Sequence, residues 1–453
     1  MVQQKTLVAL AAFSFAQVQG ITFDTQSADS VKSAASTIAS GMISYYNGNE
    51  TGNVPGLLPA PYYWWEGGAL FDTLLRYWQM TGDTQYNDLV SQALVFQQGP
   101  NGDYMPPNQT KSEGNDDQAI WALAAMSAAE LKFPESANTS WISMAEAVFN
   151  DQAARWDTST CNGGLRWQIF TFNNGYNYKN SASNGLFFQL ASRLARYTGN
   201  TTYSDWASKV YDWSRDIGFI DEKFNVFDGS DTTTNCTSVN HVQFSYCAGT
   251  FISGAAYLYN ATSGSSQWKT TLDGFVNQTL AIFFSTGIAD EEACESHETC
   301  TVDMKAFKGI LAQDLTTAIQ LAPYLESLIM PILQETAKAA ADTCTGGVSG
   351  TECALSWTGS SDSSDFGLGQ QLSALSYVQA LLVSQAATPV TMSTGGSNGT
   401  VTTGGGASST STSGSSTTSG SAATTTNSAA VAVGKASISL VAALLGSVAW
   451  MTL

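Results

Sequence analysis

Two adjacent aspartates, Asp116 and Asp117, are the residues of this sequence whose types and spacing are best suited to acid–base chemistry. They stand in the run Gly114-Asn115-Asp116-Asp117-Gln118, directly before an apolar segment. The chain has only 2 histidines, so proton transfer must fall mainly on carboxyl groups. Glycoside hydrolysis uses two carboxyl groups, one to protonate the leaving oxygen and one as nucleophile or base. Neighbouring residues favour the separation of about 5 Å that retaining enzymes require.

The same pair also has a purely structural explanation. Acidic residues in the first turn of a helix complement the helix dipole. We expect Asn115 to be the N-cap and Gln118 to complete a capping box at the third helical position. Because a helix N-terminus lowers carboxyl pKa values, burial or the neighbouring charge must raise one of them. The expected working state has one ionised and one protonated aspartate.

Further candidate residues for substrate contact are polar or aromatic, and most of them lie near the starts of expected helices. They are Trp65, Glu66, Asn115, Asn177, Asn180, Asn184, Asp228, Gln243 and Tyr246. Aromatic faces pack against the apolar faces of sugars, while amides and acids bond hydroxyl groups. Some have ordinary alternatives, since a tryptophan at a helix start is often core and asparagines are common in turns.

The elements that must position these residues are helices. Leu186, Leu190 and Leu194 follow the spacing of one helix face, and runs of alternating Val and Ile are lacking. Glycines and aromatic residues recur together, with an aromatic four positions after each glycine: Gly82 and Tyr86, Gly199 and Tyr203, Gly264 and Trp268. With Trp141, these aromatic residues lie 55 to 65 residues apart, which is the length of a helical hairpin with its loops. Each glycine is expected to end one helix and each aromatic to lie early in the next.

Six such hairpins are predicted, with their first helices starting near Trp65, Asp117, Asn184, Ala248, Phe307 and Gly367. The expected fold is therefore an all-α (α/α)6 barrel, because each hairpin buries its apolar face only against its neighbours. An open solenoid is the alternative, but it would need polar capping repeats. In a closed barrel the loops that enter the inner helices share one rim, so residues 62–66, 113–117, 177–184, 243–246 and 303–305 should converge.

The two ends of the chain have compositions that differ from its middle. Residues 1–20 are typical of a signal peptide, and residues 21–390 form the expected catalytic domain. Residues 391–427 are rich in Ser, Thr and Gly and predict an unfolded stalk. Residues 428–453 are typical of a glycosylphosphatidylinositol (GPI) attachment signal that is removed on anchoring, with Asn427 as the attachment residue. A weak transmembrane helix is the alternative. We expect a secreted protein anchored to the outer face of the cell membrane, with the cell wall as a second location.

Charge and glycosylation signals agree with this location. The formal net charge of −19 disfavours nucleic acid as a partner, and the 12% of charged residues suits a neutral, hydroxyl-rich ligand. Glycosylation motifs occur at Asn49, Asn108, Asn138, Asn200, Asn235, Asn260, Asn277 and Asn398.

The 7 cysteines indicate disulfides rather than a metal site. Proximity in sequence favours the pairs Cys294–Cys300, Cys344–Cys353 and Cys236–Cys247, leaving Cys161 unpaired, although spacing alone does not fix the connectivity. No metal and no cofactor are expected.

The sequence resembles glycoside hydrolase family 76, the endo-α-1,6-mannosidases, and within it the fungal GPI-anchored branch. The resemblance covers residues 21–383. It rests on the motifs Tyr63-Trp64-Trp65-Glu66-Gly67-Gly68, Gly114-Asn115-Asp116-Asp117-Gln118, Gly164-Leu165-Arg166-Trp167-Gln168, Asn177-Tyr178-Lys179-Asn180 and Phe307-Lys308-Gly309. It implies an (α/α)6 fold and a retaining mechanism with Asp116 as nucleophile and Asp117 as acid/base.

The resemblance also implies a substrate, either α-1,6-mannan or the glycan of a GPI anchor, and a role in fungal cell-wall biogenesis. Two alternatives stay open. The chain could act as a transglycosidase that moves GPI mannoproteins onto wall glucan, or as a non-catalytic wall protein that binds mannan. We expect a monomer.

Overall fold

The computed structural model describes residues 20–135, 140–359 and 365–397. The expected signal peptide up to residue 19, the stalk from residue 398 and the GPI signal lie outside the described residues, as do Asn138, Asn398 and Asn427.

The described residues form twelve α-helices and one small sheet. The helices are α1 (Ala28–Ile43), α2 (Trp64–Thr81), α3 (Asn87–Phe96), α4 (Asn115–Glu130), α5 (Trp141–Ala154), α6 (Ser181–Thr198), α7 (Thr201–Asp216), α8 (Ser245–Ala261), α9 (Ser266–Phe283), α10 (Met304–Leu321), α11 (Glu326–Asp342) and α12 (Leu368–Ala380). The strands are β1 (Tyr178–Asn180), β2 (Gly229–Asp231) and β3 (Val239–Asn240).

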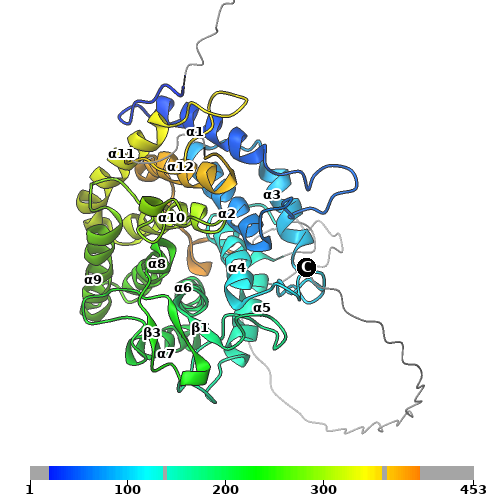
Figure 1. Ribbon diagram of the computed structural model, residues 1–453, viewed down its shortest axis with the longest axis vertical. Helices are drawn as coiled ribbons and strands as arrows, with labels where there is room; N and C mark the ends of the chain where they lie inside the picture. Colours follow the sequence, from blue (N-terminus) through cyan, green and yellow to red (C-terminus); the bar gives the residue numbers. More distant parts are fainter. Residues whose placement is uncertain (1–19, 136–139, 360–364, 398–453) are drawn as a thin grey trace, which may run out of the picture. The chain divides into compact units, whose positions relative to one another are not determined.

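The even-numbered helices form a closed inner ring (Figure 1). Each packs against the next, from α2 through α4, α6, α8 and α10 to α12, and α12 returns to α2. The odd-numbered helices lie outside this ring, with α3, α5, α7 and α9 each against the helix before it in the chain. The all-α (α/α)6 barrel is confirmed. An open solenoid is excluded because α12 contacts α2.

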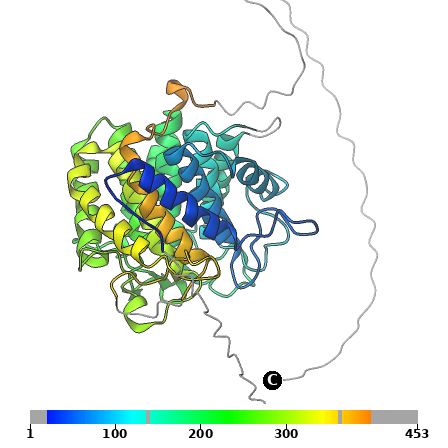
Figure 2. The ribbon, with the colours of Figure 1, turned by 90° about the horizontal axis from the view of Figure 1, so that it is seen from above.

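The sixth hairpin closes in a way that the repeat pattern did not predict. No outer helix follows α12 among the described residues, and α1 from the N-terminal end packs along α12 instead (Figure 2). The apolar side of α1, with Ala35, Ile38 and Met42, is fully buried there. The first and the last α-helix of the described residues therefore pack together as the sixth pair of outer and inner helices.

The predicted glycine and aromatic signals lie where one helix ends and the next begins. Gly82 and Gly199 end α2 and α6 with φ of 78° and 73°, in the left-handed region that favours glycine. Tyr86 precedes α3 as its N-cap, and Trp141 is the first residue of α5. Both aromatic side chains are buried, so each outer helix is held to the ring by its first turn.

Buried polar side chains join the inner helices inside the ring. Arg193 of α6 donates to Glu130 of α4 over 2.7 Å, and the Tyr257 hydroxyl of α8 donates to the same carboxylate. Gln189 of α6 donates to Asp314 of α10 over 2.7 Å. Since buried polar groups are costly unless bonded, these pairs favour one arrangement of the helices.

Gln313 of α10 extends this network to the two remaining inner helices. Its side-chain amide donates to the hydroxyls of Thr73 in α2 and Ser376 in α12, over 2.8 and 2.9 Å. All six inner helices thus share buried hydrogen bonds.

One disulfide prediction was wrong and two are confirmed. Cys294–Cys300 and Cys344–Cys353 form as expected. The third bond joins Cys161 to Cys236, across 75 residues, and Cys247 is a buried free thiol. The reason is the antiparallel sheet β1-β2-β3, which brings the loop before β1 to the loop between β2 and β3. Cys247 lies instead in the first turn of α8, inside the barrel wall.

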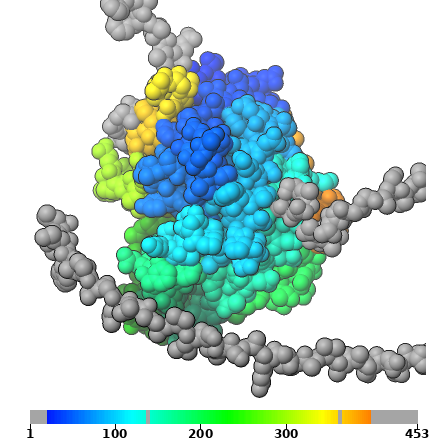
Figure 3. Space-filling model, turned by 90° about the vertical axis from the view of Figure 1, so that its right-hand side faces the viewer, coloured from blue at the N-terminus to red at the C-terminus, as the bar shows by residue number. Residues whose placement is uncertain are grey.

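The asparagines of the predicted glycosylation motifs lie on the surface. All six sequon asparagines within the described residues are exposed. Figure 3 shows one side of the barrel, on which the N-terminal segments in blue and cyan form neighbouring stretches of surface. Within the described residues, no helix combines the length and apolar character that crossing a membrane requires.

The first residues of the expected stalk have a defined structure. Residues 392–394 form a 3-10 turn, and the Tyr197 hydroxyl of α6 donates to the carbonyl of Ser397 over 3.0 Å. The backbone N–H of Val390 donates to the carbonyl of Glu130. The chain therefore stays attached to the barrel as far as residue 397.

Candidate active site

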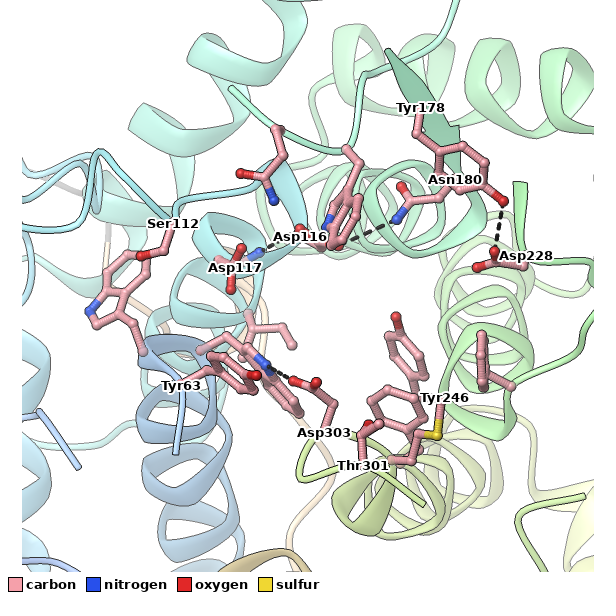
Figure 4. Close-up of a pocket in the computed structure, with 18 residues that line it drawn as sticks. Tyr63, Ser112, Asp116, Asp117, Tyr178, Asn180, Asp228, Tyr246, Thr301 and Asp303 are labelled. Atoms are coloured by element: carbon pink, nitrogen blue, oxygen red, sulfur yellow. Dashed lines mark hydrogen bonds between the residues drawn. The ribbon is translucent and has the colours of Figure 1, made fainter. Parts of the chain in front are cut away.

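A cleft of about 460 Å³ lies where the inner helices begin (Figure 4). It is lined by Tyr63, Trp64, Trp65, Ser112, Asp116, Asp117, Ile120, Trp167, Gln168, Tyr178, Asn180, Asp228, Phe244, Tyr246, Thr301, Asp303, Met304 and Phe307. Each of the five rim segments predicted to converge contributes at least one of these residues. The predicted convergence is confirmed.

Asp117 is fixed by the backbone that begins its own helix. The N-cap of α4 is Gly114, and the Oδ2 of Asp117 accepts a hydrogen bond from the Gly114 N–H over 2.7 Å. The expectation that Asn115 caps the helix and Gln118 completes the box was wrong by one residue. The reason is that the Asn115 N–H bonds the carbonyl of Trp167, over 2.8 Å, which places Asn115 in the first turn.

Asp116 lies beside Asp117 at the same helix end and accepts two hydrogen bonds. The backbone N–H of Asp117 donates to its Oδ1 over 3.1 Å, and the side-chain amide of Asn180 donates to its Oδ2 over 3.4 Å. Asn180 is itself the N-cap of α6, where its Oδ1 accepts from the Ser183 N–H. The bond from Asn180 joins the first turn of α4 to the N-cap of α6 along one side of the cleft (Figure 4).

The pKa values of both aspartates lie above the usual range for aspartate. Burial raises the pKa of Asp117 to about 7, the Gly114 hydrogen bond opposes this, and the charge of Asp303 adds to it. Burial and the charge of Asp117 raise the pKa of Asp116 well above its usual value. Because two like charges disfavour each other, ionisation of one aspartate favours protonation of the other.

An aromatic wall faces this pair. The rings of Tyr246 and Phe307 lie 4.0 Å apart between centroids, tilted by 32°, and Trp65 lies 6.2 Å from Phe307. The indole N–H of Trp65 donates to Asp303 Oδ1 over 2.9 Å. Apolar ring faces beside carboxylates form a surface that suits a sugar ring and its hydroxyl groups.

Another part of the cleft holds Asp228. Its Oδ2 accepts from the Tyr178 hydroxyl over 2.7 Å and from the Asn240 side-chain amide over 2.9 Å. Burial raises the pKa of Asp228. Tyr178 starts β1, so the sheet positions this group relative to Asp116 on α4.

Five residues predicted to bind substrate do not line the cleft. They are Glu66, Asn115, Asn177, Asn184 and Gln243. Glu66 is 1% exposed, and its Oε2 accepts from the Tyr63 N–H at the start of α2. Asn184 is fully buried and bonds both the N–H and the carbonyl of Leu165, so it holds the loop behind the cleft.

Asn115 and Asn177 also have structural roles. The Asn115 side chain is 2% exposed and donates to the carbonyl of Arg166 over 2.8 Å. The Oδ1 of Asn177 accepts from the same arginine's guanidinium over 3.3 Å. Trp65, Asn180, Asp228 and Tyr246 do line the cleft, as predicted.

Several lining residues were not singled out from the sequence. Tyr63, Trp64 and Asp303 lie within segments expected at the rim, and Trp167 and Gln168 belong to a motif used for the family resemblance. Phe307 marks the start of an inner helix by sequence, but its inward orientation depends on how α10 packs. Within the described residues, no cluster of three or more His, Cys, Asp or Glu side chains is placed to hold a metal ion.

Comparisons with known proteins place this chain among glycosidases. The profile described as Glycosyl hydrolase family 76 matches residues 30–393. Mannan endo-1,6-alpha-mannosidase DFG5 of Saccharomyces cerevisiae is 41% identical over 85% of this chain and 85% of its own length. Mannan endo-1,6-alpha-mannosidase DCW1 of the same yeast is 43% identical over 83% of this chain and 85% of its own.

Solved structures share the fold. The crystal structure of Dfg5 from Chaetomium thermophilum, in complex with glucosamine, is 41% identical with a TM-score of 0.80, covering 84% of this chain and 97% of its own. An inactive variant of an α-1,6-mannanase from Salegentibacter, in complex with α-1,6-mannotriose, has a TM-score of 0.63 at 20% identity. Its alignment covers 78% of this chain and 99% of that one. The chain thus belongs to glycosyl hydrolase family 76.

Proposed function

We propose that this protein is a retaining, endo-acting glycosidase that cleaves α-1,6-mannosidic linkages in mannan or in a GPI glycan. The observation that carries the proposal is the adjacent pair Asp116 and Asp117, both with raised pKa values, in a cleft with an aromatic wall. The linkage follows from the names of relatives that are more than 40% identical over most of the chain.

In this proposal the two aspartates divide the chemistry. Asp117 gives its proton to the glycosidic oxygen while the Asp116 carboxylate attacks the anomeric carbon and forms a glycosyl ester. Asp117, now ionised, then takes a proton from the water that hydrolyses the ester, and the starting state is restored. A pKa of about 7 suits Asp117 for both steps, because an acid/base group works best when its pKa lies near the working pH.

The surroundings of Asp116 support its role as nucleophile. Burial is the largest cause of the raised pKa of Asp116, and the charge of Asp117 adds to it; when Asp117 holds the proton, this second contribution is removed. The N–H groups of Asp117 and Asn180 then stabilise the Asp116 carboxylate. Substrate binding between Asp117 and the aromatic wall would exclude water, which strengthens these interactions.

The ends of the chain complete the proposal. Cleavage of the signal peptide, a stalk leading to Asn427 and a GPI lipid would hold a monomeric enzyme outside the cell membrane, near wall polysaccharide. Three disulfides support an oxidising, extracellular location. A sugar hydroxyl of wall glucan could replace water as the acceptor, because the glycosyl ester is common to both reactions.

The test is turnover of unbranched α-1,6-mannan by single variants. Asp116→Asn and Asp117→Asn should each lower the release of reducing ends by at least about 1,000-fold, since both groups act on the reacting atoms. Asp88→Asn is the matched control, because Asp88 is also an acid in the first turn of a helix but is exposed on α3. Undiminished turnover by either cleft variant would refute the assignment.

A further inference from the structure

Asp303 is a third carboxylate in the cleft, and it is held in a defined position. It precedes α10, and its Oδ1 accepts the indole N–H of Trp65 over 2.9 Å. Asp303 and Asp117 both border one cavity in Figure 4. The Trp65–Asp303 hydrogen bond joins α2 to the residue before α10. Burial raises the pKa of Asp303, and the indole N–H of Trp65 opposes this because it favours the ionised form of the carboxylate.

No positive charge offsets Asp303 among the residues that line the cleft, none of which is Lys, Arg or His. Lys305, two residues further on, bonds Asp365 over 2.9 Å. Arg155, whose charge acts on Glu113, donates to Gln118 and lies 3.7 Å from Asp151.

The charge of Asp303 acts on Asp117, a member of the catalytic pair. This charge raises the pKa of Asp117, whereas the charge that raises the pKa of Asp116 is that of Asp117. The other groups around the pair are Glu113 and Glu66, buried at the starts of α4 and α2 with pKa values raised to about 8. Both are largely protonated below pH 7, so neither acts on Asp117 as a full charge.

The other titratable groups that line the cleft are Asp228, Tyr63, Tyr178 and Tyr246. Asp228 is bonded by Tyr178 and Asn240 in another part of the cleft, and burial raises the pKa of Tyr246 far above neutrality. Asp303 is therefore the carboxylate outside the pair that is best placed to decide where the shared proton resides.

We propose that Asp303 is a positioning residue whose charge, held in the cleft by Trp65, keeps the shared proton on Asp117 and so leaves Asp116 free to attack. This role rests on the proposed function. It requires no contact between Asp303 and the bond that breaks, and it explains why the indole N–H of a cleft tryptophan faces a carboxylate rather than the cavity.

The test is the pH profile of kcat/KM for Asp303→Asn on α-1,6-mannan. Asparagine can still accept the Trp65 N–H but carries no charge. Removing the charge lowers the pKa of Asp117, so the basic limb, where the acid loses its proton, should move to lower pH. The expected shift is roughly half to one pH unit, the order produced by one like charge in a half-buried site. A basic limb that stays within about 0.2 unit of the wild type, or moves up, overturns the proposal.

Two further variants separate charge from structure. Asp303→Glu keeps the charge, so its basic limb should lie close to that of the wild type. If the role of Asp303 were merely structural, Asp303→Asn and Asp303→Glu would be equally impaired at every pH. Asp228→Asn removes another cleft carboxylate and should leave the basic limb in place, whatever its effect on KM. Thermal unfolding checks that each variant folds. If Asp303→Asn does not fold, Asp303→Ser is a second variant with a neutral side chain.

The outcome is distinguishable from failure of the proposed function. If Asp116→Asn and Asp117→Asn keep full activity, the assignment of the pair fails. If those variants are inactive and the basic limb of Asp303→Asn does not move, only the role of Asp303 fails.

Discussion

At the scale of single residues, the candidate chemistry depends on how closely two carboxylates approach the backbone. Asp117 bonds the Gly114 N–H, and a side chain on Gly114 would collide with the Oδ1 of Asp116. The added carbon would also lie 2.7 Å from Asp117 Oδ2 and 3.0 Å from the Trp167 carbonyl. Gly114 has an ordinary φ of −95°, so glycine is needed here for space rather than for backbone conformation.

Gly114→Ala should therefore displace both aspartates while the helix still forms. We expect kcat to fall by about 100-fold or more, because misplacement of reacting groups by about 1 Å has effects of this size. Gly41→Ala, within α1, is the control, since its added carbon would meet only the Gln371 side chain at 3.3 Å. Steady-state kinetics with both variants decides the matter, and normal kcat in folded Gly114→Ala would show that the close approach is unnecessary.

The sequence made the aspartate pair visible because two acids follow a glycine and precede an apolar helix. It could not reveal Asp303, since an acid next to a helix start is unremarkable until Trp65 is placed across the cleft from it. It also could not separate Asn180, which reaches Asp116, from Asn184, which is buried one turn further along the same helix. Both asparagines have the same chemistry, and only the helix rotation distinguishes them.

At the scale of elements, apolar helical spacing, glycines and buried aromatic residues predicted the helices well because these are local signals. The start of α4 falls within two residues of Asp117, and α10 starts three residues before Phe307. The role of α1 was not predictable in this way, since its partner α12 lies at the other end of the barrel sequence. The small sheet was also missed, because strands of two or three residues carry no periodicity.

The disulfide between Cys161 and Cys236 should stabilise the folded protein more than the disulfide between Cys294 and Cys300 does. It closes 75 residues, whereas Cys294–Cys300 closes 6. Loop entropy predicts losses of about 4 and about 2 kcal/mol, respectively, when each pair is replaced by serines.

Urea unfolding of the two double-serine variants measures this difference. The Cys161/Cys236 variant should also bind substrate less well, because the bond secures the loops that flank Tyr178 and Asp228. An equal loss in both variants would indicate that the unfolded chain is already compact around the sheet.

At the scale of the whole molecule, closure of the ring creates an interior that buries acids as well as apolar side chains. Burial raises the pKa values of Glu66, Glu113 and Glu291 to about 8 and of Asp314 to about 7. Each folded-state pKa exceeds the unfolded value of about 4, so the folded protein binds more protons between these limits. The contribution of these groups to the free energy of unfolding is fully present below pH 4 and is lost as pH rises toward 8.

The melting temperature should accordingly fall by several degrees between pH 5 and pH 8. Each such group reduces the free energy of unfolding by up to about 1.4 kcal/mol per pH unit in this window. Glu113→Gln should weaken the dependence, since a neutral amide replaces an acid that folding keeps protonated. A melting temperature that rises from pH 5 to pH 8 would mean that these acids are ionised in the folded protein.

The most direct test of the central claim is the configuration of the first sugar that the enzyme releases. Proton NMR can follow unbranched α-1,6-mannan during cleavage, before the new reducing ends equilibrate between anomers. If Asp116 forms a glycosyl ester and Asp117 supplies and recovers the proton, the wild-type protein releases the α anomer first. The Asp116→Asn variant should give no product above background. First release of the β anomer by the wild-type protein would contradict the account, because inversion leaves no place for Asp116 as the nucleophile.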